Sequence, residues 1–191
     1  MTAYRVRLAA APDAEAICRI YNQGIEDRVA TLETELRTPD ERRQWLANRS
    51  PRHPVIVAEL ADGLSADAEP ARASLRPPSV QAGHTAPATI AWASLNVFNA
   101  REAYRFVADI SVYVERGWRG RGVGRALLET LTELGRAHGF HKLVLSAFPG
   151  NAGGMALYAR SGFRTVGIYH EQGQLDGKWV DTIVMEKLLS A

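Results

Sequence analysis

Cysteine is almost absent from the 191-residue sequence, and Cys18 is the only one. The chain therefore has no internal disulfide and no cysteine-based metal site. Its five histidines show none of the spacings typical of metal ligands, so we expect no metal. Charge of one sign is scarce too: the formal net charge is +2. That imbalance is too small to indicate a nucleic acid as the partner.

Long hydrophobic runs are also missing. No segment approaches the roughly 18 consecutive apolar residues that a membrane-spanning helix needs. The first residues lack the apolar stretch and cleavage site of a signal peptide. We therefore expect a cytoplasmic protein without a membrane partner. The sequence is 46% hydrophobic and 23% charged, as is typical of a globular chain, and its length fits one domain over residues 1–191.

Residues 61–88 differ in character from the rest of the chain. The segment carries four prolines and no apolar periodicity. Such a composition is typical of a solvated loop rather than of packed structure. We expect a mobile insertion between two strands, although a role in binding a partner stays open.

The most informative stretch, residues 110–128, predicts a strand, a tight glycine turn and an amphipathic helix. Gly120, Gly122 and Gly124 alternate in the turn, where they allow a sharp bend and leave no Cβ between backbone and ligand. The N–H groups that begin a helix favour phosphate. An ordinary strand–helix connection is the alternative. A Walker-type site is disfavoured because no Gly-Lys-Ser or Gly-Lys-Thr closes the turn. The spacing also fits a Rossmann dinucleotide site poorly.

The remaining pattern predicts an α/β domain. Its element order, β-α-α-β-β-β-α-β-α-β-β, predicts a mixed, mainly antiparallel sheet with helices on both faces. Strands are predicted at 4–8, 53–59, 89–96, 104–114, 142–147, 163–169 and 179–188. Helices are predicted at 12–24, 38–48, from 123 to about 136, and at 151–161.

Arg119-x-x-Gly122-x-Gly124 resembles the acyl-CoA pyrophosphate loop of the GNAT superfamily of N-acetyltransferases. The resemblance implies the GNAT fold, with six to seven strands and about four helices, and acetyl-CoA as co-substrate. It also implies that the backbone N–H groups of Tyr113 and Val114 polarise the thioester carbonyl if the sheet opens there. The acetyl-CoA contacts that it implies are Val112, Tyr113, Val114, Arg119, Gly120, Arg121, Gly122, Val123, Gly124, Arg125, Asn151 and Tyr158.

Two residues are candidates for proton transfer. Asn151 and Tyr158 resemble a second GNAT signature, and a phenol can donate a proton to the departing thiolate. The alternative is that Tyr158 packs as a helix aromatic beside Leu157. Asp109 precedes an apolar run on a central strand, where an unused carboxylate is costly, so it is a candidate base. Its alternative is an ion pair with a nearby arginine, Arg101 or Arg105.

A narrower resemblance, to the phosphinothricin acetyltransferase subfamily, covers most of the chain outside the insertion. It rests on motifs such as Tyr21-Asn-Gln, Ser111-Val-Tyr-Val114 and Gly177-Lys-Trp-Val-Asp181. Members acetylate the α-amino group of small glutamate-like amino acids, and a homodimer is expected from the resemblance. Asp109 stands where the subfamily usually has glutamate, so the shorter carboxylate is expected to reach less far, with a water between it and the amine.

The acceptor site is predicted around six residues. Arg101 matches a subfamily arginine in the loop before the central strand, and its guanidinium is suited to hold a substrate carboxylate through two parallel hydrogen bonds. A surface arginine without a ligand is the alternative. Trp92 and Tyr104 are candidates for pocket walls, although packing is the default for such aromatics. Glu33 and Thr34 are candidates to shape the amine site. Lys178 lies in a turn that closes either the pocket or a dimer contact.

Together, these features predict a cytoplasmic, acetyl-CoA-dependent N-acetyltransferase acting by direct transfer in a ternary complex. The expected acceptor is a small glutamate-like amino acid of the phosphinothricin, methionine sulfoximine or arsinothricin type. Such an activity implies a role in antibiotic or herbicide resistance. Two alternatives stay open: an enzyme that acetylates a protein N-terminus or a polyamine, and a non-catalytic acyl-CoA-binding sensor.

Overall fold

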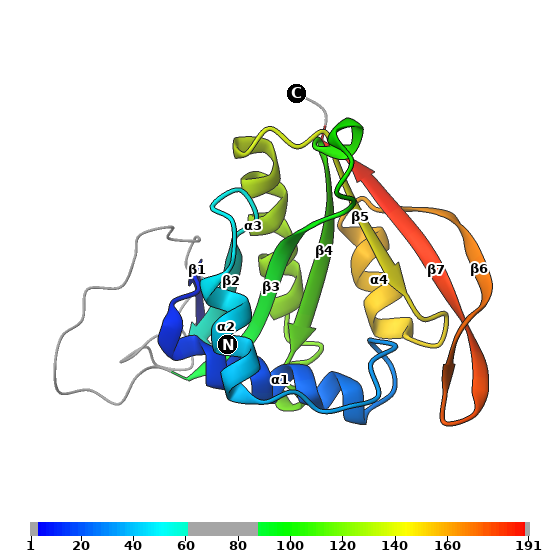
Figure 1. Cartoon of the computed structure of the whole chain (residues 1–191), viewed down its shortest axis with the longest axis horizontal. Coiled ribbons are helices and arrows are strands. Elements are labelled where there is room, and N and C mark those ends of the chain that lie inside the picture. The colour runs from blue at the N-terminus through cyan, green and yellow to red at the C-terminus, as the bar shows by residue number, and fades with distance from the viewer. Residues whose placement is uncertain (1–3, 61–87, 190–191) are drawn as a thin grey trace, which may run out of the picture.

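The computed structural model describes residues 4–60 and 88–189, which form one seven-stranded sheet with helices on both faces (Figure 1). The strand order is β1-β2-β3-β4-β5-β7-β6, and β4–β5 is the only parallel pair among the described strands. The predicted mixed, mostly antiparallel sheet is therefore confirmed. The strands are β1 (Tyr4–Leu8), β2 (Val55–Leu60), β3 (Thr89–Val97), β4 (Val107–Val114), β5 (Lys142–Ala147), β6 (Arg164–Leu175) and β7 (Lys178–Leu188).

The four α-helices are α1 (Ala14–Glu26), α2 (Pro39–Ala47), α3 (Val123–Ala137) and α4 (Ala152–Arg160). The start of α2 follows the local sequence closely. Thr38 Oγ1 accepts a hydrogen bond from the Glu41 N–H at 3.2 Å, and the Glu41 carboxylate accepts one from the Thr38 N–H at 2.6 Å. This is the reciprocal capping box expected from a threonine followed three residues later by glutamate.

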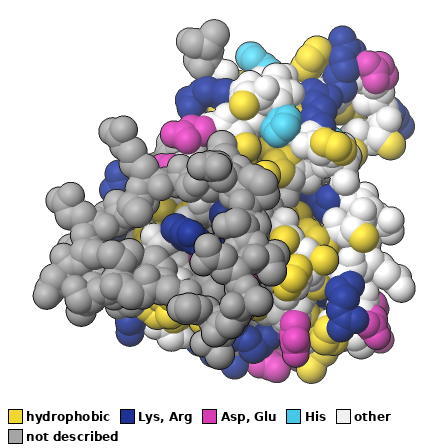
Figure 2. All heavy atoms as spheres, turned by 90° about the vertical axis from the view of Figure 1, so that its left-hand side faces the viewer, with side chains coloured by type: hydrophobic (Ala, Val, Ile, Leu, Met, Phe, Trp, Pro, Cys, Tyr) yellow, Lys and Arg dark blue, Asp and Glu magenta, His cyan; other side chains and the backbone are white. Residues whose placement is uncertain are grey.

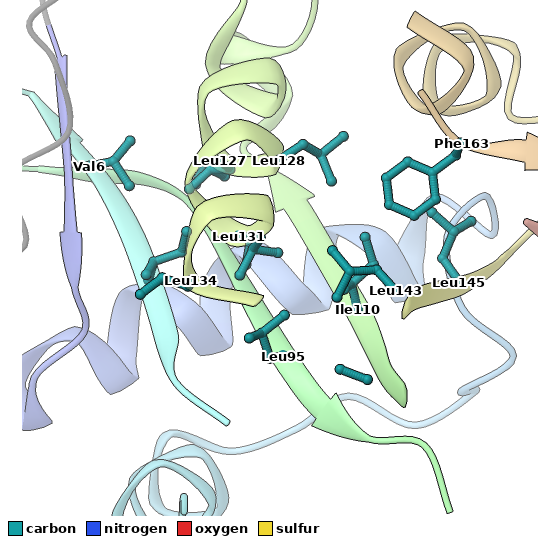
Figure 3. Packing of buried hydrophobic residues seen from close by; sticks show 14 of the residues in the cluster. Val6, Leu95, Ile110, Leu127, Leu128, Leu131, Leu134, Leu143, Leu145 and Phe163 are labelled. Atoms are coloured by element: carbon teal, nitrogen blue, oxygen red, sulfur yellow. The ribbon is translucent and has the colours of Figure 1, made fainter. Parts of the chain in front are cut away.

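The larger core lies between α3 and the sheet. One face of α3 carries the leucines that the sequence pattern places at helical spacing, and these side chains point toward the strands (Figure 3). They meet alternate residues of the central strands, because successive strand side chains point to opposite faces. The labelled members of this cluster are Val6, Leu95, Ile110, Leu127, Leu128, Leu131, Leu134, Leu143, Leu145 and Phe163.

A second, aromatic core lies on the other face of the sheet, under α1 and α2. Trp92 of β3 and Tyr113 of β4 stand opposite each other in register, and their rings stack at 4.8 Å. Tyr21 of α1 packs against both rings, and Trp45 of α2 packs edge-on against Trp92 at 5.6 Å. Gly24 allows this packing, because a Cβ there would lie 3.0 Å from the Tyr113 ring. These residues therefore fix one face of β4 against α1.

The sheet opens between its two parallel strands. Only Val107 to Asp109 of β4 pair with Lys142 to Val144 of β5. Beyond these residues β4 pairs only with β3, and β5 only with β7. Figure 1 shows the two strands diverging toward their C-terminal ends. Asp109 therefore lies at the point where the sheet divides.

Two strand boundaries differ from the sequence-based expectation by three residues or more. β4 begins at Val107 rather than at residue 104, because Glu102–Tyr104 forms a 3₁₀ turn closed by the Tyr104 N–H on the Arg101 carbonyl. β6 continues to Leu175 rather than ending at residue 169, since register shifts let its bent second half pair with β7. The expected insertion at 61–88 lies outside the described residues except for Ala88.

The described surface mixes charges of both signs. On the face presented in Figure 2, both acidic and basic side chains are visible among the described residues. Within residues 4–60 and 88–189, none of the helices has the length and apolar character required to cross a membrane.

Candidate active site

The glycine turn between β4 and α3 holds a row of backbone donors open. Gly120 and Gly122 have φ values of +76° and +84°, a left-handed conformation that costs non-glycine residues free energy. None of the N–H groups from Gly120 to Gly124 donates to another described residue. The first turn of a helix has no internal acceptors for its N–H groups. The turn thus presents free N–H donors that are suited to the oxygens of a phosphate.

Arg119 is held beside this turn. Its Nε donates to the Val114 carbonyl at 3.1 Å, and its Nη1 donates to Asp27 at the end of α1 at 2.7 Å. Arg116 donates to the same carboxylate at 2.7 Å. The two guanidiniums hold the pKa of Asp27 below its ordinary value. Arg125 is more exposed and pairs with Glu129 at 2.8 Å.

A cavity of about 630 Å³, which we call the glycine-turn cavity, extends from this turn into the opening of the sheet. Most of the residues predicted to bind the cofactor line it. Two do not: Val123 is 1% exposed in the core, and Arg121 lies over the Trp118 ring. The lining predicted from sequence comprises Val112, Tyr113, Val114, Arg119, Gly120, Gly122, Gly124, Arg125, Asn151 and Tyr158.

A smaller cavity of about 160 Å³, the central cavity, lies where β4 and β5 part. Asp109 and Tyr158 both line it, so the structure brings the two candidate proton-transfer residues together. Val112, Tyr113, Asn151 and Tyr158 also line the glycine-turn cavity, and the two spaces therefore adjoin.

Asp109 has the environment of a group that can take up a proton near neutral pH. Burial raises its pKa to about 6, although hydrogen bonds from Asn96 and from the Ile110 backbone oppose the shift. Asn96 Nδ2 lies 3.4 Å from Asp109 Oδ2 and 3.0 Å from Ser111 Oγ. The alternative, an ion pair with a nearby arginine, is not formed: Arg105 pairs with Glu102 at 2.9 Å.

Tyr158 is protonated at physiological pH. Burial and the nearby Asp109 raise its pKa to about 12. Its ring packs edge-on against Phe163 at 6.1 Å rather than simply lying beside Leu157. Asn151 is the N-cap of α4, and its side chain accepts a hydrogen bond from the Gly154 N–H at 2.9 Å. This cap fixes the start of the helix that carries Tyr158.

A third cavity, of about 430 Å³, lies between α2 and the sheet, and we call it the α2 cavity. It shares Ser111 and Tyr113 with the central cavity. Of the predicted acceptor residues, Glu33 and Trp92 line it. The other lining residues could not be predicted as acceptor contacts from the sequence, since their convergence depends on how α1 and α2 pack on the sheet. Those residues are Tyr21, Arg37, Glu41, Arg42, Trp45, Asn96, Ser111 and Tyr113, the last proposed only as a cofactor contact.

Four other predicted acceptor residues lie outside these three cavities. Arg101 and Tyr104 are exposed on the segment before β4, where Tyr104 packs against Phe98 at 5.4 Å. Thr34 and Lys178 are also exposed. The structure does not bring these four side chains to the α2 cavity, and their roles in substrate binding stay predictions.

Divided parallel strands, a phosphate-binding turn, and a carboxylate and a phenol at the division define an acyl-CoA-dependent transferase. The model of the acetyltransferase (GNAT) family matches residues 25–163, and the chain belongs to this family. It is an N-acetyltransferase that uses acetyl-CoA. The resemblance noted in the sequence and the expected fold are both confirmed.

Several relatives are similar along nearly the whole chain. The L-methionine sulfoximine/L-methionine sulfone acetyltransferase of Pseudomonas aeruginosa is 28% identical over 95% of this chain and 92% of its own. A phosphinothricin acetyltransferase of Sinorhizobium meliloti, whose structure contains acetyl-CoA, is 27% identical with a TM-score of 0.81. The match covers 100% of this chain and 90% of the Sinorhizobium chain. A ribosomal-protein-alanine N-acetyltransferase of Brucella melitensis is 30% identical with a TM-score of 0.78, covering 96% and 98%.

Proposed function

We propose that the enzyme acetylates the α-amino group of a small glutamate-like amino acid, by direct transfer from acetyl-CoA in a ternary complex. The observation that carries this proposal is the row of adjoining cavities. The glycine-turn cavity suits the coenzyme, the α2 cavity is small and lined by charged and aromatic groups, and Asp109 and Tyr158 lie between them. The names of the Pseudomonas and Sinorhizobium relatives support an acceptor of this class and a role in resistance.

Acetyl-CoA fits the residues of the glycine-turn cavity. The free N–H groups from Gly120 to Gly124 are suited to the pyrophosphate oxygens, with Arg119 adding positive charge beside them. The sheet opens at Tyr113 and Val114. This opening is what their backbone N–H groups would need in order to reach the thioester. Their N–H groups as donors to the thioester carbonyl remain part of the proposal.

The chemistry requires a base and a donor. With a pKa of about 6, Asp109 is largely ionised at pH 7 and can take the proton that the amine loses as its nitrogen bonds to the acetyl carbon. As the carbon–sulfur bond breaks, Tyr158 stabilises the leaving thiolate. Because its pKa is about 12, we propose that it chiefly donates a hydrogen bond, and complete proton transfer to the sulfur then comes from solvent.

The first test is release of free thiol from acetyl-CoA with a panel of acceptors. We expect turnover with phosphinothricin or methionine sulfoximine, and much slower turnover with spermidine and with a short alanine peptide. Turnover with the peptide alone would replace the proposal by acetylation of a protein N-terminus, which the Brucella relative's name supports. Tight binding of CoA without any turnover would favour a non-catalytic sensor.

Tyr158→Phe is expected to lower kcat about 10- to 100-fold, because the departing sulfur loses its buried donor while the ring packing is kept. Pre-steady-state release of thiol measures the affected step. The KM for the amino-acid acceptor should stay near that of the unaltered enzyme, since Tyr158 does not line the α2 cavity. An unchanged kcat would remove Tyr158 from the reaction.

We also propose that the enzyme is a homodimer through β6 and β7. β6 is an edge strand, and large apolar side chains stand exposed on this hairpin: Val166 at 58%, Tyr169 at 56% and Trp179 at 60%. Exposed apolar edges of this kind favour association.

Light scattering should give twice the chain mass, and Trp179→Glu should shift the measured mass toward that of the monomer. A monomer mass for the unaltered protein would contradict this.

A further inference from the structure

The α2 cavity contains two buried donors without acceptors. Within the described part of the chain, Arg42 Nε and Trp92 Nε1 have no hydrogen-bond partner. Arg42 is 9% exposed and Trp92 is 2% exposed, and both line this cavity. Buried polar groups are nearly always paired, because an unmet donor costs free energy. Two such donors in one cavity indicate that an acceptor of hydrogen bonds belongs there.

The two carboxylates that line the cavity are bound by groups other than Arg42. Glu33 is bound by Arg37 Nε at 2.6 Å, and Glu41 accepts the Thr38 N–H and lies 3.7 Å from Arg37. For Arg42, the described residues provide no ion pair and no side-chain hydrogen bond. A buried guanidinium without a hydrogen-bonded acceptor is unfavourable, and an anion in the cavity would supply that acceptor.

Aromatic rings hold the Arg42 guanidinium in place. Its central carbon lies 4.1 Å from the centre of the Tyr21 ring and 5.4 Å from that of Trp45. Trp92 contacts the same two rings, at 5.9 and 5.6 Å between ring centres. Stacking of this kind leaves the planar fork of N–H groups free for a ligand and limits the rotamer entropy that binding would cost.

The cavity also reaches the reaction centre. Asn96 and Ser111 line it, and Asn96 hydrogen-bonds to both Ser111 and Asp109. A small acceptor whose amine is at Asp109 therefore has the α2 cavity available for its remaining atoms. We propose that Arg42, together with the Trp92 indole N–H, binds an anionic oxygen group of the acceptor. This inference rests on the proposed function only in taking that anion to be part of an amino acid.

The test compares Arg42→Gln and Arg42→Lys with a matched control, Arg43→Gln. Arg43 is the next residue of α2, but it is exposed and paired with Asp40. Calorimetry with the CoA-bound enzyme would measure binding of phosphinothricin, of its analogue without the α-carboxylate, of glutamate and of glutamine. Acetylation kinetics would be measured with the same acceptors.

For Arg42→Gln we expect binding and kcat/KM of the doubly anionic acceptors to fall about 30-fold or more, the size of a lost charge-assisted pair. The KM for acetyl-CoA should not change. Arg42→Lys should lie between, because it keeps the charge but not the fork, and Arg43→Gln should match the unaltered enzyme. Glutamine lacks the side-chain anion, and the phosphinothricin analogue lacks the α-carboxylate. The loss of binding should be smaller for the acceptor that lacks the group bound by Arg42, and this comparison identifies that group.

Equal losses for anionic and neutralised acceptors would mean that Arg42 only supports aromatic packing, and would overturn the inference. If Arg42→Gln does not fold, as a thermal melt would show, the same comparison is made with Arg42→Lys. Binding that depends on Arg42 without acetyl transfer would reject the proposed function and leave the inference intact. No binding of any of these acceptors by the unaltered enzyme would overturn it.

Discussion

Asp109→Asn is expected to lower kcat/KM for the acceptor by about 10²- to 10⁴-fold, the usual contribution of a positioned base. The carboxylate lies where β4 and β5 separate and shares the central cavity with Tyr158. The substitution keeps the size of the side chain but removes its charge and its ability to take a proton at neutral pH. The KM for acetyl-CoA should change little, because Asp109 does not line the glycine-turn cavity.

The pH profile gives a second readout of Asp109. In the unaltered enzyme, kcat/KM should fall as the pH drops below about 6, where burial places the pKa of this carboxyl. Because the Asn96 hydrogen bond lowers that pKa, Asn96→Ala should move the acid limb to higher pH. Asp109→Glu serves as the matched control and should keep much of the activity. A flat acid limb, or an active Asp109→Asn enzyme, would assign the base elsewhere.

Asp109→Asn should also raise the stability of the fold. The folded-state pKa of Asp109 is above its ordinary value of 3.8, so folding favours the protonated form. The contribution of the protonated Asp109 carboxyl to stability is then fully present below pH 3.8 and is lost as the pH rises through about 6. The neutral amide avoids this decline and should gain up to about 3 kcal/mol at pH 7. A rise in Tm would also show that lost activity is not lost folding.

Glu59→Gln is expected to destabilise the protein by about 3–5 kcal/mol, the cost of breaking a buried ion pair. Glu59 of β2 is 1% exposed and accepts hydrogen bonds from Arg5 at 2.5 Å and from Arg7 at 2.7 Å. Arg7 also donates twice to Asp13, at 2.7 and 2.9 Å. Burial alone lowers the pKa of Arg7, but its bonds to Asp13 and Glu59 outweigh burial and raise it. Arg7 therefore stays charged in this cluster, and Glu59→Gln would leave it with one buried counter-charge fewer.

Thermal unfolding measures this effect, with a fall in Tm of about 10 °C for a chain of this length. The control is Glu102→Gln, whose partner Arg105 and own side chain are largely exposed, and which should change stability by less than about 1 kcal/mol. Activity at low temperature should survive in both variants, since neither glutamate lines the three cavities. A Glu59→Gln protein as stable as the control would contradict the assigned role of the cluster.

The elements with strong local signals could be predicted from the sequence. The β4–turn–α3 unit is encoded by β-branched residues, alternating glycines and leucines at helical spacing, all within 20 or so residues of one another. The cap of α2 is similarly local, because Thr38 and Glu41 satisfy each other's backbone N–H groups. The confirmed order of helices and strands along the chain follows from the same pattern and from the family resemblance.

The acceptor cavity could not be predicted in the same way. Arg42 becomes distinctive only through its burial against Tyr21 and Trp45, and the sequence alone cannot separate it from Arg43 beside it. Arg101 shows the converse. It matches a subfamily arginine before the central strand, but its side chain is exposed outside the three cavities. The extension of β6 was missed because bulges hide its pairing with β7.

The gap between β4 and β5 means that this sheet lacks part of its own internal hydrogen bonding. A substrate that fills the gap acts as a structural component while it is bound, and the folded state becomes more resistant to unfolding as coenzyme concentration rises. At a free concentration of 100 times Kd, mass action adds about 2.7 kcal/mol to the free energy of unfolding. The same binding should make the enzyme more resistant to proteases, because these cleave the opened chain.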